Sequence, residues 1–148
     1  MRALDEMLDE YNLSHRNDFN KRMHWICVPL IVFSLLGLLW SLQLPRLPNV
    51  AVVTVAAALI YYALLSVRLA LGVLAVAAIM IGLIAWLEAA RLPLALISAI
   101  IFVFAWAGQF VGHHVEGRRP SFFTDLRFLL IGPLWLLAFV YRRFNLRF

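Results

Sequence analysis

The sequence predicts an all-α integral membrane protein: a helical bundle of four spans, a Pro-bent fifth apolar helix and an N-terminal amphipathic helix. Apolar residues make up 64% of the 148 residues and charged residues only 14%, whereas soluble domains average about 45–50% and roughly 25%. The charges are also segregated, because residues 25–112 contain only Arg46, Arg68, Glu88 and Arg91. Such a chain cannot cover itself with polar surface, so we expect a single membrane-embedded domain over residues 1–148.

The first element is a short amphipathic helix over residues 1–13. One face of this helix carries apolar side chains at the spacing i, i+3, i+4 and i+7: Leu4, Met7, Leu8 and Tyr11. Acidic residues occupy the other face, so we expect the helix to lie at the membrane surface or to cap the bundle. A secretory signal begins with a short basic region, which this acidic segment does not resemble. We therefore expect the apolar run that follows to be a retained first span.

Four apolar runs follow, over residues 25–42, 50–67, 69–87 and 94–111. The length of each run falls within the range of about 17–25 residues that is needed to cross the hydrocarbon core of a bilayer. The breaks between them are short and contain turn-forming or charged residues: Pro45, Pro48, Arg68, Glu88, Arg91 and Pro93. Short connections make neighbouring helices antiparallel, so these runs predict a compact four-helix membrane bundle.

The fifth apolar run, over residues 128–141, is shorter and is interrupted by Gly132 and Pro133. Its topology is indicated by charge. If four spans cross, eight basic residues share the side of the N-terminus: Arg2, Arg16, Lys21, Arg22, Arg68, Arg118, Arg119 and Arg127. The opposite side has only Arg46 and Arg91. This asymmetry places the N-terminus on the cytoplasmic side, and we expect a bacterial inner membrane.

A fifth crossing would carry the three arginines of the C-terminal tail to the outside, against this charge rule. We therefore expect a helix bent at Pro133 that returns to the cytoplasmic side. The net charge of +5 reports topology and contact with anionic lipids, and there is no basic stripe that would indicate nucleic-acid binding. Cys27 is the single cysteine, so no intramolecular disulfide and no cysteine-based metal cage can form.

The four histidines of the chain gather on one predicted side of the membrane. His15 and His24 lie at the start of the first span, and His113 and His114 lie at the end of the fourth. Polar side chains share this zone, including Asn17, Asn20, Gln109 and Glu116. Polar residues near a membrane are costly and usually functional, so the pattern favours a metal site. A single interfacial histidine is more often structural, and a non-catalytic scaffold therefore stays an alternative.

Several metals suit these residues. Neutral imidazole binds iron, zinc, copper and nickel, and His113 and Glu116 share a helix face because they are three residues apart. Two or three histidines with Glu116 would form a non-haem Fe(II) centre with open positions. The same ligands are compatible with zinc hydrolysis. A b-type haem held by His24 and His113 would make the protein a membrane electron carrier.

Two segments carry a family likeness. The first is Tyr11-x3-His15-x-Asn17-x2-Asn20-x3-His24-x4-Pro29. The second runs from Gln109-Phe110-Val111-Gly112-His113 through Glu116 to Arg118-Arg119-Pro120, with Gly132-Pro133 beyond it. Together they resemble the Mpo-like family of membrane 2-hydroxy-fatty-acid dioxygenases, formerly a domain of unknown function. The resemblance implies an Fe(II)-dependent enzyme in the lipid bilayer that cleaves a 2-hydroxy fatty acid with O2, giving CO2 and a fatty acid one carbon shorter.

The resemblance also implies roles for individual residues. His15, His24 and His113 fall on the family's histidines, and Glu116 falls near its acidic residue, so these four are the expected catalytic and metal-binding set. His114 is a further expected ligand, although adjacent helical side chains diverge unless the helix ends there, as Gly117 and Pro120 suggest. The family often has proline after the first asparagine, where this chain has Asp18.

Polar and basic neighbours have expected roles in the same resemblance. Asn17 and Asn20 either cap the turn into the first span or, as we favour, orient the ligand imidazoles from outside the ligand set. Gln109 is placed with them. The substrate carboxylate is expected to be oriented by arginine side chains through bidentate pairs: Arg22, Arg118 and Arg119. Positive-inside anchoring is the other explanation for these arginines, and the oligomeric state is open.

Overall fold

The computed structural model describes residues 2–13, 15–117 and 127–148, and their regular structure is entirely helical. Six helices follow one another along the chain: α1 (Arg2–Leu13), α2 (Asp18–Ser41), α3 (Val50–Leu65), α4 (Val67–Ala89), α5 (Leu94–Glu116) and α6 (Arg127–Arg143). The all-helical fold predicted from the sequence is therefore confirmed.

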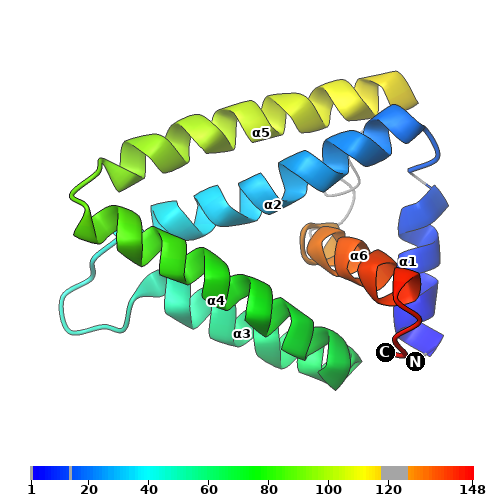
Figure 1. Cartoon of the computed structure of the whole chain (residues 1–148), viewed down its shortest axis with the longest axis horizontal. Helices are drawn as coiled ribbons and strands as arrows, with labels where there is room; N and C mark the ends of the chain where they lie inside the picture. Colours follow the sequence, from blue (N-terminus) through cyan, green and yellow to red (C-terminus); the bar gives the residue numbers. More distant parts are fainter. Residues whose placement is uncertain (1, 14, 118–126) are drawn as a thin grey trace.

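Helices α2 and α5 form the main pair of the fold, lying side by side and antiparallel (Figure 1). Small residues allow the two backbones to approach closely. A methyl group added to Gly112 on α5 would lie 2.7 Å from Oδ1 of Asn20 and 3.1 Å from Cβ of Met23, both on α2. Antiparallel pairing puts the first turns of α2 beside the last turns of α5, which is where the histidines are.

Helices α3 and α4 form a second antiparallel pair, separated by a single residue. The side chain of Ser66 accepts a hydrogen bond from the N–H of Leu69, and its backbone N–H donates to the carbonyl of Tyr62. In Figure 1 the two helix pairs meet at one end of the molecule and diverge toward the other. The diverging end is the one that holds α1 and α6.

Helix α6 does not run alongside the long helices. It is seen nearly end-on in Figure 1, so it crosses the open end of the molecule, with α1 against it. Pro133 lies inside α6 and removes one helical hydrogen bond, and the nearby carbonyl of Leu130 accepts a hydrogen bond from the hydroxyl of Tyr62 at 2.7 Å. Buried side chains of α1, such as Leu4 and Leu8, pack in the same core cluster as those of α6.

The surface of the described residues is that of a membrane protein. Among them, α2, α4 and α5 are long and apolar enough to cross a bilayer, whereas α3 is apolar but has only 16 residues. Large apolar side chains point outward along these helices, as Leu64 (82% exposed) and Phe104 (73% exposed) show. Such exposure in water would be an aggregation hazard, but it is what a lipid-facing surface requires.

Candidate metal centre

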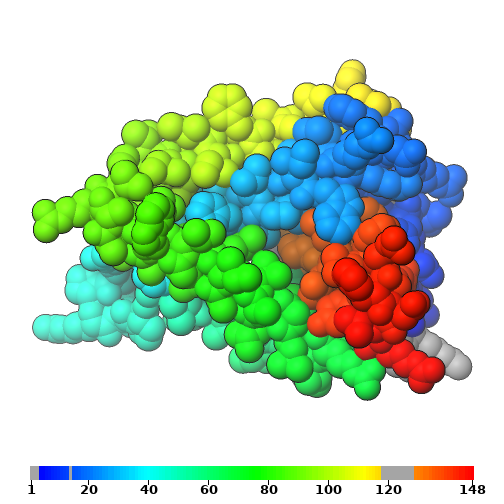
Figure 2. All heavy atoms as spheres, viewed as in Figure 1, coloured from blue at the N-terminus to red at the C-terminus, as the bar shows by residue number. Residues whose placement is uncertain are grey.

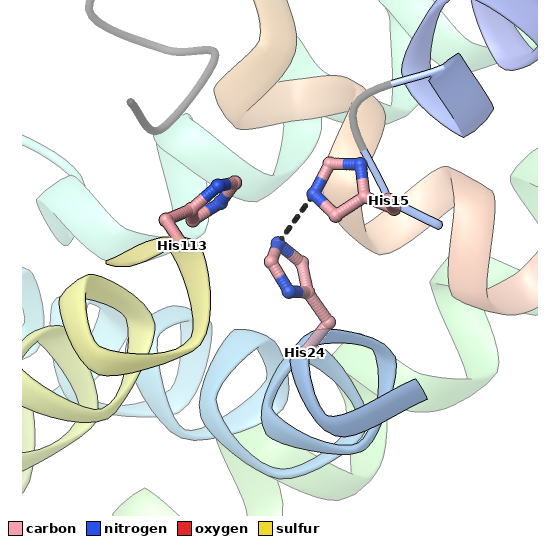
Figure 3. A group of neighbouring side chains, drawn as sticks. All are labelled: His15, His24 and His113. Carbon is pink, nitrogen blue, oxygen red and sulfur yellow. Dashed lines mark hydrogen bonds between the residues drawn. The ribbon is translucent and has the colours of Figure 1, made fainter. Parts of the chain in front are cut away.

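Three histidines from separate parts of the chain converge at the diverging end of the fold. His24 lies in the second turn of α2, His113 lies in the last turn of α5, and His15 lies in the short turn between α1 and α2. All three are almost completely buried, with exposed fractions of 2–3%. Figure 3 shows their rings directed toward one common space. One ligand atom from each ring can be chosen so that all three lie within 4.8 Å of one another.

Hydrogen bonds to main-chain carbonyls orient two of the rings. Nδ1 of His15 donates to the carbonyl oxygen of Tyr11 at 2.7 Å, and Nδ1 of His24 donates to that of Asn20 at 3.0 Å. A carbonyl oxygen can only accept, so each of these rings carries its proton on Nδ1. In the neutral rings both Nε2 atoms therefore present lone pairs, which is the form of histidine that binds metals.

The two Nε2 atoms face each other at 2.9 Å (Figure 3). Two lone pairs at that distance repel each other unless a cation lies between or beside them. Burial lowers the pKa of His15 below its usual value, which disfavours an extra proton as that cation. Two nitrogens bound to one metal at about 2.1 Å lie about 3 Å apart when the angle between the bonds is near 90°.

The third ring supplies a further donor. Nδ1 of His113 is buried and has no hydrogen-bond partner among the described residues. A buried polar atom without a partner is costly, and coordination of a metal ion at Nδ1 would relieve that cost. The donor set of His15, His24 and His113 therefore fits a metal ion that accepts three nitrogen ligands.

Glu116 lies outside the histidine group and has a different role in the structure. One carboxylate oxygen accepts the backbone N–H of Arg16, and the other accepts the backbone N–H of Asn17, both at 2.9 Å. The second oxygen also accepts from Nδ2 of Asn20 at 3.1 Å. Because the bonds at Arg16 and Asn17 join the last turn of α5 to the segment that follows His15, Glu116 fastens that segment in place.

The expected amide residues are nearby, but their side chains do not hold the described imidazoles. Asn17 caps α2, since its side chain accepts from the N–H groups of Phe19 and Asn20. Asn20 is fully buried and donates from its side chain to Glu116, while its main-chain carbonyl accepts from His24. Gln109 is also buried, one turn before His113 on α5.

The remaining expected residues are not brought into the group. His114 is exposed, because it follows His113 on a helix that continues to Glu116 and then ends at Gly117 in the left-handed conformation (φ 72°). Arg22 is exposed at the start of α2. Arg118 and Arg119 lie outside the described residues.

Two aromatic residues without an expected role enclose the site. The ring of Tyr11 stacks on His15, with centroids 4.1 Å apart and planes 16° apart. The ring of Trp135, from α6, lies 5.7 Å from that of His15, and its Nε1 donates to Oδ1 of Asn12 at 2.7 Å. These rings exclude water from one side of the histidines. Tyr11 begins the first of the two segments that carry the family likeness, whereas no pattern in the sequence marks Trp135.

Comparison with known proteins identifies a family for the chain. The family model described as "2-hydroxy-palmitic acid dioxygenase Mpo1-like" matches residues 1–144. The chain has no significant match among curated proteins or among solved structures. Because the matched segment spans nearly the whole chain and contains all three buried histidines, the protein belongs to the 2-hydroxy-palmitic acid dioxygenase Mpo1-like family.

Proposed function

We propose that this protein is an Fe(II)-dependent dioxygenase of 2-hydroxy fatty acids. The reaction consumes one O2 and converts R–CH(OH)–COOH into R–COOH, CO2 and water, so the chain is shortened by one carbon. The observation that carries the proposal is the pair of Nε2 atoms 2.9 Å apart, with a ligand atom of the buried His113 within 4.8 Å of the other two histidines' ligand atoms. Membership of the family supports the substrate class.

His15, His24 and His113 would hold the iron. Three protein ligands, rather than a complete set, are typical of catalytic metal sites, which keep positions open. Fe(II), when bound, would supply the redox chemistry that allows O2 to react. The chain contributes a dry pocket, because Tyr11 and Trp135 cover the histidines, and it contributes orientation, because carbonyl groups and Glu116 hold the ligand-bearing segments. Buried, preoriented imidazoles lose little freedom on binding a metal.

A haem is less well accommodated by the same residues. The ring centroids of His24 and His113 are 5.0 Å apart, and the ring of His15 packs against both, at 4.2 Å and 5.2 Å. A macrocycle would have to occupy the space between two axial imidazoles, where the third imidazole already lies. The site therefore favours a small ion over a b-type haem.

The position of the histidines at helix ends suits this substrate. We propose that α3 crosses together with α2, α4 and α5, giving four spans, and that α1 and α6 lie at the cytoplasmic interface. The histidines lie at helix ends, so they would meet the carboxyl end of a fatty acid whose chain is in the bilayer. Arg22 is the described cation nearest in sequence to His24 and would attract the carboxylate at the interface. The same role is proposed for Arg118 and Arg119.

Turnover by the purified protein tests this function. O2 uptake and release of the shortened acid are measured with 2-hydroxypalmitate after reconstitution with Fe(II), in wild type and in two neighbouring variants. We expect His113→Ala to lose at least about 100-fold in activity, since even residues outside a ligand set cost 10–100-fold. We expect His114→Ala to keep wild-type activity, because His114 is exposed. An inactive wild type, or equal activity in both variants, would refute the proposal.

A further inference from the structure

A groove lies where α2, α4 and α6 meet, beside the histidines but separate from them. Its volume is about 210 Å³, and every side chain that lines it is apolar. Contributions come from all three helices, among them Trp25, Val28, Val32, Ala77, Met80 and Pro133. Figure 2 shows the surface hollowed at this meeting point. A polar ligand would find no partner in such a groove, whereas a hydrocarbon chain suits its lining.

One end of the groove is adjacent to the metal centre. Val28 lines the groove and lies one helical turn after His24 on α2. Across from it, a methyl group added to Gly132 of α6 would lie 3.7 Å from Val28 and 3.2 Å from the hydroxyl of Tyr11, whose ring stacks on His15. Helices α2 and α6, which line the groove, therefore also pack beside the histidines, and Tyr11 of α1 lies at this junction.

The other end of the groove is closed. Val32 and Met80 line it and also pack against a buried cluster formed by Leu36, Ala51, Ile84 and Leu94. This cluster lies deeper between the helix pairs than Val28. A chain that starts at the histidines would thus run along the groove and stop at Val32 and Met80.

We propose that this groove holds the alkyl chain of the 2-hydroxy fatty acid and that its closed end selects chain length. The inference rests on the proposed function for the identity of the ligand. A single unbranched chain with its carboxyl end at the histidines matches the position, the apolar lining and the closed end. A bilayer lipid would enter the groove only from its outer face, and its head group would not be placed at the histidines.

Neighbouring alanines on α4 provide a matched test. Ala77 is buried and lines the groove, whereas Ala78 is exposed on the outer face of the same turn. Ala77→Phe fills the groove, so we expect activity on 2-hydroxypalmitate to fall at least about tenfold relative to 2-hydroxyoctanoate. Ala78→Phe is expected to keep the wild-type ratio. Met80→Ala, which lengthens the closed end, is expected to shift the preference toward longer chains, and it provides the test if Ala77→Phe does not fold.

A binding readout separates this inference from the proposed function. A 2-hydroxy fatty acid with a diazirine at its methyl end is photo-crosslinked to the metal-free protein, and the labelled peptides are identified. We expect labelling of α4 around Met80 and its loss in Ala77→Phe but not in Ala78→Phe. Absence of turnover in wild type with this labelling intact would refute only the reaction. Turnover with a chain-length profile that is unchanged in Ala77→Phe and Met80→Ala, together with random labelling of outward faces, would overturn the assignment of the groove to the alkyl chain.

Discussion

Replacing Glu116 by glutamine distinguishes a residue that positions His15 from one that binds the metal. The carboxylate accepts three N–H groups, from Arg16, Asn17 and Asn20. Glutamine keeps the size of the side chain but has one oxygen and one NH2 group. In its better orientation the oxygen keeps the bonds of Asn17 and Asn20, and the NH2 group faces the N–H of Arg16.

The cost follows from these bonds. One hydrogen bond to a charged acceptor is lost, which is worth about 1.5–3 kcal/mol, and two others become neutral and weaker. Glu116 is partly open to solvent, so the low end of this range applies, and we expect a total of about 2 kcal/mol. If all of it acts on the segment that carries His15, the affinity for metal falls about thirtyfold, within the range of about 10–100-fold typical of residues that support ligands.

The assay is competition between the protein and a chelator for Fe(II) or Co(II), with Glu10→Gln as the control because Glu10 is an exposed acid on α1. The Co(II) spectrum reports the ligand set directly. A weakened site with an unchanged Co(II) spectrum agrees with a positioning role. Wild-type affinity in Glu116→Gln would refute that role, and a complete loss with a changed spectrum would mean that Glu116 is itself a ligand.

Two other substitutions test the packing around the site. Gly112→Ala places a methyl group 2.7 Å from Oδ1 of Asn20, so we expect it to destabilise the protein by about 1–3 kcal/mol and to lower its metal content. The control is Gly82→Ala, whose methyl group meets no atom within 4 Å. Thermal unfolding in detergent should show this control to be neutral or stabilising. Trp135→Phe removes the hydrogen bond to Asn12 and should lower the stability by about 0.5–1.5 kcal/mol; unchanged unfolding would show that this bond contributes nothing.

The helical class and the convergence of three histidines could be predicted because both depend on patterns along the chain. Apolar runs separated by short breaks lead to antiparallel helices, and antiparallel helices bring the start of the first run beside the end of the fourth. His24 and His113 therefore meet, and the short connection carries His15 to them. The break at residue 68 was expected between two spans, and the structure places a break at Ser66, with α3 two residues shorter than the expected run.

The partners of the site residues could not be predicted in the same way. The hydrogen bonds of Glu116 go to backbone N–H groups that are free only because α2 begins at Asp18, and no residue type in the sequence marks such donors. The carbonyl groups that accept from His15 and His24 could not be predicted either, because every residue has a carbonyl group. Trp135 reaches the histidines because α6 crosses the end of the bundle, and the direction of such a helix depends on tertiary contacts such as that of Tyr62 with Leu130.

The most direct test is the metal content of the protein. Iron is measured by mass spectrometry after anaerobic reconstitution with Fe(II), in wild type, His24→Ala, His113→Ala and the exposed control His114→Ala. Three buried imidazoles whose ligand atoms lie within 4.8 Å of one another predict close to one iron per chain in wild type and in His114→Ala, without a Soret band, and loss of iron in the other two variants. A wild type without iron, or iron retained equally in His24→Ala and His113→Ala, would contradict the assignment of these histidines as a metal centre.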